Sequence, residues 1–192
     1  IDGTLNVAKE QDHISKIVSE PDKGIYDALN KGIKNSNGEI IGFLNSDDTF
    51  YDENSLQHIV DAFDDNTDCV FGDLIYTDKN ERVKRVWKGS EFKKRAFKKG
   101  WMPAHPTFYC RRSVYEKLGL YDDSFNIAGD FELMLRFLEK HNIRSKYLLD
   151  FFILMVGPIG VLSFVIFAIF EFKNQKQSFF VGISWGIIVL LN

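Results

Sequence analysis

Cysteine is scarce in this 192-residue chain, which contains only Cys69 and Cys110. Two cysteines without a metal-binding spacing exclude both a disulfide framework and a cysteine-based zinc site. Each lies in an apolar run of the length of a buried strand, so we expect two free core thiols in a reducing compartment. The chain also has no excess of positive charge, since its net charge is -3. We expect no nucleic-acid partner, because such a partner requires a clustered basic surface.

The composition is that of a folded domain. Apolar residues make up 45% and charged residues 27% of the chain, which allows a sizeable core and argues against disorder. The length fits one ordinary domain with a remainder. No signal peptide is visible, and the sequence opens at Ile1 inside what reads as a turn. We therefore expect that an N-terminal piece of the protein is missing from this chain.

Residues 1–148 read as one α/β unit. Apolar residues recur at helical spacing in four segments, 24–35, 54–63, 113–118 and 130–141. Short runs rich in β-branched, aromatic or other apolar residues predict strands over 39–44, 69–76 and 107–110, and 82–87 reads as a strand joined to 69–76 by a polar turn. The early alternation of helix and strand favours a mostly parallel sheet with helices on both sides. Ligands of such sheets bind beyond the carboxyl ends of strands, and residues 45–48 follow one such end.

Residues 149–192 form a second, hydrophobic region. The segment 151–170 contains no charged residue and is long enough to cross a bilayer as a helix. A buried core helix is the alternative, although five helical turns without a polar face are unusual in a core. The segment 179–191 is apolar again but too short to span. More basic residues precede 151–170 than follow it, which places the α/β unit in the cytoplasm. We expect hydrophobic helices that associate with the membrane.

A basic cluster lies in the middle of the chain. Its cations stand beside Phe92, Phe97 and Trp101 and are Lys93, Lys94, Arg95, Lys98 and Lys99. A solvated helix face is one interpretation of this pattern. The other is an edge that meets anionic lipid or an anionic lipid-linked acceptor.

Adjacent carboxylates follow the apolar strand expected over 39–44. Asp47 and Asp48 place two like charges at one spot, where they repel unless a cation is bound. Mg²⁺ or Mn²⁺ fits such a site, because these ions bind oxygen ligands and bridge carboxylates to a diphosphate. An ordinary polar turn after a strand is the alternative.

Five blocks of the sequence form an ordered set: residues 1–4 (IDGT), 19–32 (SEPDKGIYDALNKG), 38–48 (GEIIGFLNSDD), 105–109 (HPTFY) and 129–133 (GDFEL). Together they resemble a bacterial family 2 glycosyltransferase of the GT-A fold. Each block is weakly specific alone, whereas five in the right order and spacing are strongly specific. The resemblance covers residues 1 to about 147. It implies a Rossmann-like mixed sheet with flanking helices, from which the first strands, expected before Ile1, are missing.

The resemblance also implies roles for single residues. Asp130 matches the general base that removes the acceptor proton, with a helix N-cap as the alternative. Asp47 and Asp48 match the metal motif. The residues expected to bind the donor are Asp22, Asp27, Asn30, Asp47 and His105. Their alternatives are helix capping for Asp22, a solvated helix face for Asp27 and Asn30, and a structural histidine between two prolines for His105. Tyr26 and Trp101 either stack on a base or sugar or pack in the core.

The expected function is the inverting, metal-dependent transfer of a sugar in cell-envelope glycan biosynthesis. The donor is a nucleotide-diphosphate sugar, with a UDP-sugar expected first, and the acceptor is a polysaccharide, a lipopolysaccharide or a lipid-linked glycan. The Gln-x-x-Arg-Trp block of processive synthases is absent, which argues against a polymerising enzyme. The expected location is the cytoplasmic face of the bacterial inner membrane. The alternatives are a non-catalytic nucleotide-sugar or glycan-binding module and a nucleotidyltransferase, although the latter's Gly-rich phosphate loop is not seen.

Overall fold

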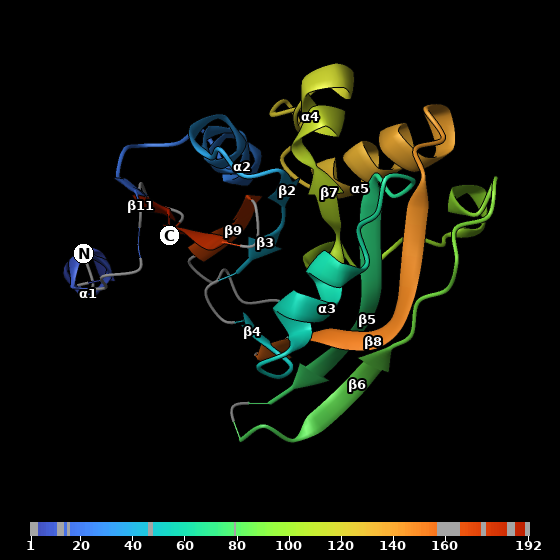
Figure 1. Cartoon of the computed structure of the whole chain (residues 1–192), viewed down its shortest axis with the longest axis horizontal. Helices are drawn as coiled ribbons and strands as arrows, with labels where there is room; N and C mark the ends of the chain where they lie inside the picture. Colours follow the sequence, from blue (N-terminus) through green and yellow to red (C-terminus); the bar gives the residue numbers. More distant parts are fainter. Residues whose placement is uncertain are drawn as a thin grey trace.

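The computed structural model describes residues 4–10, 14, 16–45, 48–78, 80–156, 166–173, 176–183 and 187–190. These residues form a mixed α/β structure in which helices flank two sheets (Figure 1). The first sheet has the strand order β2-β7-β5-β8-β4, with β6 paired to the other part of β5. Its strands are β2 (Ile40–Ile41), β4 (Asp48–Phe50), β5 (Cys69–Thr77), β6 (Val83–Trp87), β7 (Tyr109–Arg111) and β8 (Ser145–Val156).

The second sheet joins the beginning of the chain to its end. Its strand order is β1-β11-β10-β9-β3. The strands are β1 (Lys16–Val18), β3 (Phe43–Leu44), β9 (Ile166–Lys173), β10 (Lys176–Ile183) and β11 (Ile187–Leu190). The predicted strand over 39–44 is thus divided at Gly42 between the two sheets, with β2 in the first and β3 in the second. A Cβ atom at Gly42 would lie 2.1 Å from the Tyr109 ring, so this crossing requires glycine.

The expectation of a mostly parallel sheet was wrong. Among the described strands, only β5 and β8 pair in parallel, and they run side by side through the body of the molecule (Figure 1). The other pairs are antiparallel, including the hairpins β5–β6, β9–β10 and β10–β11. Short connections account for the pairs of consecutive strands, because two strands joined by a tight turn must run in opposite directions. The remaining antiparallel pairs, such as β2–β7 and β4–β8, join strands far apart in the sequence. The observed sheet is therefore mixed.

The amphipathic segments form helices close to their predicted positions. They are α2 (Ile25–Asn35), α3 (Ser55–Asp61), α4 (Arg112–Leu118) and α5 (Gly129–Met134), and a short α1 (Thr4–Lys9) precedes them. A π-helical segment, η3 (Leu135–Lys140), continues α5, so the helix predicted over 130–141 changes its winding halfway. Two 3₁₀ turns, η1 (Phe97–Lys99) and η2 (His105–Thr107), lie between β6 and β7.

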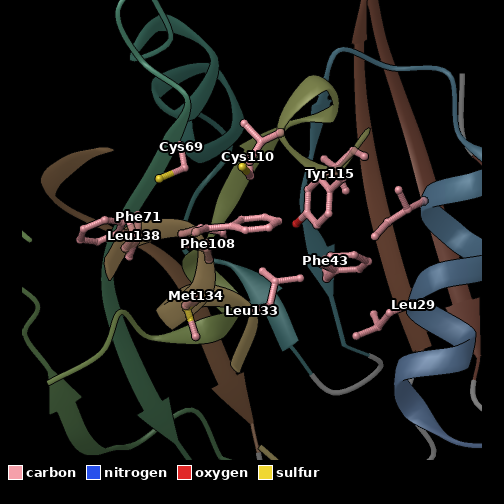
Figure 2. Packing of buried hydrophobic residues seen from close by; sticks show 14 of the residues in the cluster. Leu29, Phe43, Cys69, Phe71, Phe108, Cys110, Tyr115, Leu133, Met134 and Leu138 are labelled. Atoms are coloured by element: carbon pink, nitrogen blue, oxygen red, sulfur yellow. The ribbon is translucent and has the colours of Figure 1, made fainter. Parts of the chain in front are cut away.

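The larger core cluster lies between α2, β3, β5, α4 and α5 (Figure 2). Leu29 from α2, Phe43 from β3, Tyr115 from α4 and Leu133 from α5 meet there. Cys69 and Cys110 are both buried and free, which confirms the prediction for the two thiols. They face each other across the antiparallel pair of β5 and β7. This cluster fixes the ends of α2 and α5, which carry the candidate site.

The hydrophobic helices expected after residue 149 were wrong for the described part of that region. Residues 151–156 belong to β8, and the described residues after them form β9, β10 and β11. Phe152 and Ile153 are fully buried in a second core cluster with Val70 and Leu74 of β5. A strand buried on both faces is apolar without alternation, so its sequence resembles that of an apolar helix. No helix among the described residues has both the length and the apolar character needed to cross a bilayer.

The division at residue 148 stays a prediction. β8 runs without a break from Ser145 to Val156 and therefore passes through the expected boundary. Residues 157–165 lie outside the described part of the chain.

Candidate active site

A pocket of about 230 Å³ opens between the start of α2, the end of β3, η2 and the start of α5. We call it the α2–α5 pocket. Its lining combines apolar side chains with a few polar groups and consists of Ile25, Tyr26, Leu29, Phe43, Asn45, His105, Pro106, Tyr121, Ile127, Ala128 and Asp130. Mostly apolar walls with a few convergent polar groups are typical of small-molecule sites. The pocket therefore brings together parts of four of the five sequence blocks.

Asp130 lies in the first turn of α5, and its carboxylate faces two polar side chains. The Tyr26 hydroxyl donates to Oδ1 at 3.3 Å, and His105 Nδ1 lies 3.4 Å from Oδ2. The side chain of Asp130 is 25% exposed and that of His105 is 49% exposed. The N-cap hypothesis for Asp130 is wrong, because the N-cap residue is Ala128. The carboxylate is thus held at the pocket by side chains from two other elements.

Ala128 enters α5 with an unusual backbone. Its φ is 66°, in the left-handed region that few residues other than glycine adopt. Its carbonyl accepts the Glu132 N–H at 3.0 Å, which closes the first helical turn. Arg136 supports the same turn, since its Nε donates to Glu132 at 2.9 Å and its Nη2 donates to the Leu120 carbonyl at 2.7 Å. Glu132, which is close to Asp130 in the same turn, is therefore engaged in an ion pair with Arg136.

Tyr26 is buried, and its hydroxyl has two partners in α5. Besides donating to Asp130, it accepts the backbone N–H of Gly129 at 2.8 Å. Burial, and then the charge of Asp130, raises the pKa of the Tyr26 phenol, so the phenol stays protonated at neutral pH. Its ring stacks on Tyr121 with a centroid distance of 5.6 Å. Two roles were expected for Tyr26, stacking on a base or sugar and packing in the core, and the structure shows the packing.

Asn30 is buried and binds the backbone of Tyr121. Its amide Nδ2 donates to the Tyr121 carbonyl at 2.8 Å, and its Oδ1 accepts the Tyr121 N–H at 2.9 Å. It does not line the α2–α5 pocket in this structure. The solvated helix face considered for Asn30 is wrong, since its exposed fraction is 7%.

Asp48 is the buried carboxylate of the expected metal motif. It opens β4 with 5% of its surface exposed, and its Oδ2 accepts Nδ2 of Asn45 at 2.6 Å. Asn45 lines the α2–α5 pocket and thus joins Asp48 to it. Asp47 lies outside the described residues. No group of three or more His, Cys, Asp or Glu side chains with metal-binding geometry occurs in the described part of the chain.

Asp22 and Asp27 lie at the entrance to α2, outside the pocket lining. Asp22 Oδ1 accepts the Gly24 N–H at 3.0 Å, which fixes the turn before the helix. Asp27 accepts the Lys23 N–H at 2.9 Å and forms an ion pair with Lys31 at 3.2 Å. The Lys23 N–H, followed by Lys31, lowers the pKa of Asp27. Both contacts are those of a helix N-terminus, and donor binding by either residue stays a prediction.

The site contains residues that sequence reasoning did not select. Asn45 stood inside the recognised strand-end motif, so its position was a usable signal. Ile127 is 83% exposed on the rim of the pocket. Nothing in the sequence around Ile127 distinguishes it from any other loop residue.

Comparison with known proteins identifies the family of the region that contains this pocket. The sequence model described as "Glycosyl transferase family 2" matches residues 1–142. A PGL/p-HBAD biosynthesis glycosyltransferase of Mycobacterium bovis is 25% identical over 132 residues, which are 67% of this chain and 49% of that protein. An uncharacterized glycosyltransferase of Mycobacterium tuberculosis is 33% identical over 123 residues, 62% of this chain and 45% of that protein. An uncharacterized glycosyltransferase of Rickettsia typhi is 27% identical over 130 residues, 62% and 41% of the two chains.

The chain spans about half the length of the curated relatives it matches. The matched region contains the α2–α5 pocket in full, since every lining residue lies before residue 142. The mixed sheet with flanking helices fits the expected GT-A fold. From the five blocks, the pocket that four of them build and the match over residues 1–142, it follows that this chain belongs to glycosyl transferase family 2.

Proposed function

We propose that this protein transfers a sugar from a nucleotide-diphosphate donor to a hydroxyl group of a glycan or lipid-linked acceptor, with inversion at the anomeric carbon. The observation that carries the proposal is the Asp130 carboxylate, which lines the α2–α5 pocket beside Tyr26 and His105. A partly exposed carboxylate at a pocket can accept a proton from a bound hydroxyl group. Membership of family 2 supports the reaction class.

In the proposed reaction, Asp130 accepts the proton of the acceptor hydroxyl. The acceptor oxygen forms a bond to the anomeric carbon while the bond from that carbon to the diphosphate oxygen breaks. The nucleoside diphosphate leaves with the bonding electron pair, so charge and atoms balance. One base and one displacement give inversion, because the nucleophile enters opposite the leaving group. The pocket offers no second carboxylate that could form a covalent intermediate, among the residues described as lining it.

His105 is proposed to contact the donor phosphate or the acceptor. Its side chain is half exposed, lines the same pocket and lies 3.4 Å from Asp130. Pro106 follows it within η2, and proline fixes the backbone there. A rigid, accessible imidazole is suited to hydrogen bonding at the reacting groups.

Mg²⁺ or Mn²⁺ is proposed to be bound by Asp48 together with Asp47. Asp48 fits this role chemically, since it is a carboxylate whose partner Asn45 reaches the α2–α5 pocket. These ions take oxygen ligands and need only one or two carboxylates when a diphosphate supplies the rest. A bound ion would neutralise charge on the departing diphosphate. A UDP-sugar is the donor to test first.

The acceptor is proposed to be a cell-envelope glycan or lipid-linked glycan at the cytoplasmic face of the membrane. The basic cluster forms an exposed loop and the short turn η1, and within the described residues none of its five cations forms an ion pair. Phe97 at its centre is buried and packs edge-to-face on Phe131 at 5.4 Å. Phe131 follows Asp130 in α5, so the cluster packs against the helix that carries the proposed base. It is suited to face an anionic lipid surface or lipid phosphate.

The test is release of nucleoside diphosphate from a panel of sugar donors. The full 192-residue chain is incubated with Mg²⁺ or Mn²⁺, each UDP- and GDP-sugar, and polysaccharide or lipid-linked acceptors. We expect one donor to give acceptor-dependent release. Absence of release with every pair would contradict the proposal. Calorimetric binding of UDP without any turnover would favour the non-catalytic binding module instead.

A further inference from the structure

The hydroxyl of Tyr26 has its hydrogen-bond direction set by α5. The Gly129 N–H can only donate, and it points at the Tyr26 oxygen at 2.8 Å. The phenol oxygen therefore acts as acceptor toward Gly129, and its own proton remains for the Asp130 carboxylate at 3.3 Å. Burial keeps this proton on the phenol by raising the pKa of Tyr26. One side chain thus binds both the backbone and the carboxylate of the first turn of α5.

Glycine at position 129 makes this contact possible. A Cβ atom there would lie 2.8 Å from both Cε2 and Cζ of the Tyr26 ring. Carbon atoms that do not share a bond essentially never approach so closely. Any larger residue would push the ring away from α5. The pair Tyr26–Gly129 is therefore matched in shape as well as in hydrogen bonding.

The Tyr26 ring is itself fixed from behind. It stacks on Tyr121 with an interplanar angle of 16°. The backbone of Tyr121 is bound on both sides by Asn30, which lies one helical turn after Tyr26 in α2. Two residues of α2 thus hold one ring and its neighbour. This arrangement leaves the hydroxyl of Tyr26 little freedom to move relative to Asp130.

We propose that Tyr26 is a positioning residue that orients the Asp130 carboxylate and stabilises its ionised form through the hydroxyl–Oδ1 hydrogen bond. The inference rests on the proposed function, in which Asp130 is the base. Oδ1 is engaged by Tyr26, so the other oxygen, on the side of His105, is the one that accepts the acceptor proton. A hydrogen bond donated to a carboxylate favours its charged form.

Several titratable groups face Asp130 and must be separated in the test. Tyr26 comes from α2, His105 from η2 and Tyr121 from the segment between α4 and α5. Glu132 lies two residues further along α5 and is paired with Arg136. Burial lowers the pKa of His105 and the charge of Asp130 opposes this shift, so the contribution of the histidine to a pH profile must be separated. The variant His105→Gln therefore assigns which limb of the profile belongs to the histidine.

The experiment compares Tyr26→Phe with Tyr147→Phe. Tyr147 is a matched control, because its hydroxyl also donates to a carboxylate, that of Asp73 at 2.6 Å, in a different part of the core. For Tyr26→Phe we expect the acid limb of the kcat/KM profile to move up by about 0.5–1 pH unit. We also expect kcat to fall about tenfold with donor KM within about twofold. Tyr147→Phe should leave the acid limb in place. An unchanged limb in Tyr26→Phe would overturn the proposal.

A second measurement does not depend on turnover. The carboxyl carbon of Asp130, labelled with ¹³C and assigned from the signal lost in Asp130→Asn, is titrated by NMR. We expect its midpoint in Tyr26→Phe to rise by about the same amount as the acid limb. If no donor is turned over while this midpoint shifts, the proposed function fails and the positioning role stands. If turnover occurs and the midpoint is unchanged, the positioning role fails alone.

Gly129→Ala provides an independent route to the same contact. The added methyl group should displace the Tyr26 ring and reproduce the upward shift while Tyr26 itself is retained. This variant tests the contact if circular dichroism shows that Tyr26→Phe does not fold. A folded Gly129→Ala protein with a wild-type midpoint would overturn the proposal.

Discussion

Asp130 lies on the wall of the α2–α5 pocket with a quarter of its side chain exposed, whereas Asp48 is almost fully buried at the start of β4. Asp130 faces two groups that can exchange or donate protons, Tyr26 and His105. The Asp48 carboxylate instead accepts a hydrogen bond from the amide of Asn45 at 2.6 Å. A proton acceptor must be reachable by its substrate, while a buried carboxylate needs compensating charge or hydrogen bonds. The two carboxylates are therefore suited to different tasks.

Removing the charge of Asp130 should have the largest effect. In Asp130→Asn the pocket keeps its shape but loses the carboxylate proposed to accept the acceptor proton. We expect turnover to fall about 10³-fold, within the range for loss of a general base, with UDP binding retained. Turnover and calorimetric titration measure the two quantities. Glu132→Gln serves as the control in the same helical turn and should retain most of the activity. Comparable activity of Asp130→Asn and wild type would remove the distinction between the two carboxylates.

The next effect is expected at Asp48. The variant Asp48→Asn keeps the size of the side chain and removes its charge, so it should lower turnover about 10²-fold by weakening charge stabilisation on the diphosphate. Chelation by EDTA should reproduce the loss in wild-type protein, and added Mn²⁺ should restore it. Turnover with a metal titration is the measurement, and Asp52→Asn, in the exposed turn after β4, is the control. Full activity in EDTA would contradict the metal proposal.

Replacement of Asn30 tests stability rather than chemistry. In Asn30→Ala the N–H and carbonyl of Tyr121 lose their side-chain partner, so unfolding free energy should fall by about 2 kcal/mol. Because Tyr121 supports the Tyr26 ring, the acid limb should also move slightly upward. Urea denaturation followed by circular dichroism measures the stability. If the Asn30→Ala protein is as stable as wild type but has a raised donor KM, the result would support the donor-binding role expected from sequence.

Asp27 should show the smallest effect. The folded protein lowers the pKa of Asp27, so its stabilising contribution is present above the unfolded pKa and is lost as pH falls through the folded value. Because the carboxylate and its partner Lys31 are partly solvated, we expect Asp27→Asn to cost about 0.5 kcal/mol or less at neutral pH. The difference from wild type should vanish in acid. Denaturation curves at neutral and acid pH measure this, and a large rise in donor KM would show a binding role instead.

Local sequence patterns predicted most helices of this protein but not the pairing of its strands. The apolar spacing in 24–35 and 54–63 was sufficient for α2 and α3, because each helix buries one face. The run 151–156 was misread, because Phe152 and Ile153 are both buried and a strand without a polar face has no period of two. The parallel pairing of β5 with β8 could not be predicted from local sequence either, since it joins segments more than 70 residues apart.

The candidate site was predicted unevenly for the same reason. Asp130 and His105 were found through the order of family-like blocks, and the structure brings them to one pocket. The contact of Tyr26 with Asp130 joins residues 104 positions apart, so no local pattern reports it. Asn30 was expected to bind the donor, with a solvated helix face as the alternative, whereas its amide binds a distant backbone. Polar residues that satisfy buried backbone groups cannot be distinguished from ligand-binding ones by sequence spacing.

The stereochemistry of the product tests the central claim most directly. The wild-type chain is supplied with an α-linked UDP-sugar that supports turnover, and the anomeric configuration of the new linkage is read by ¹H NMR. A single base at Asp130 and one direct displacement predict a β-linked product only. A product with the α configuration of the donor would exclude a single in-line displacement and would contradict the account.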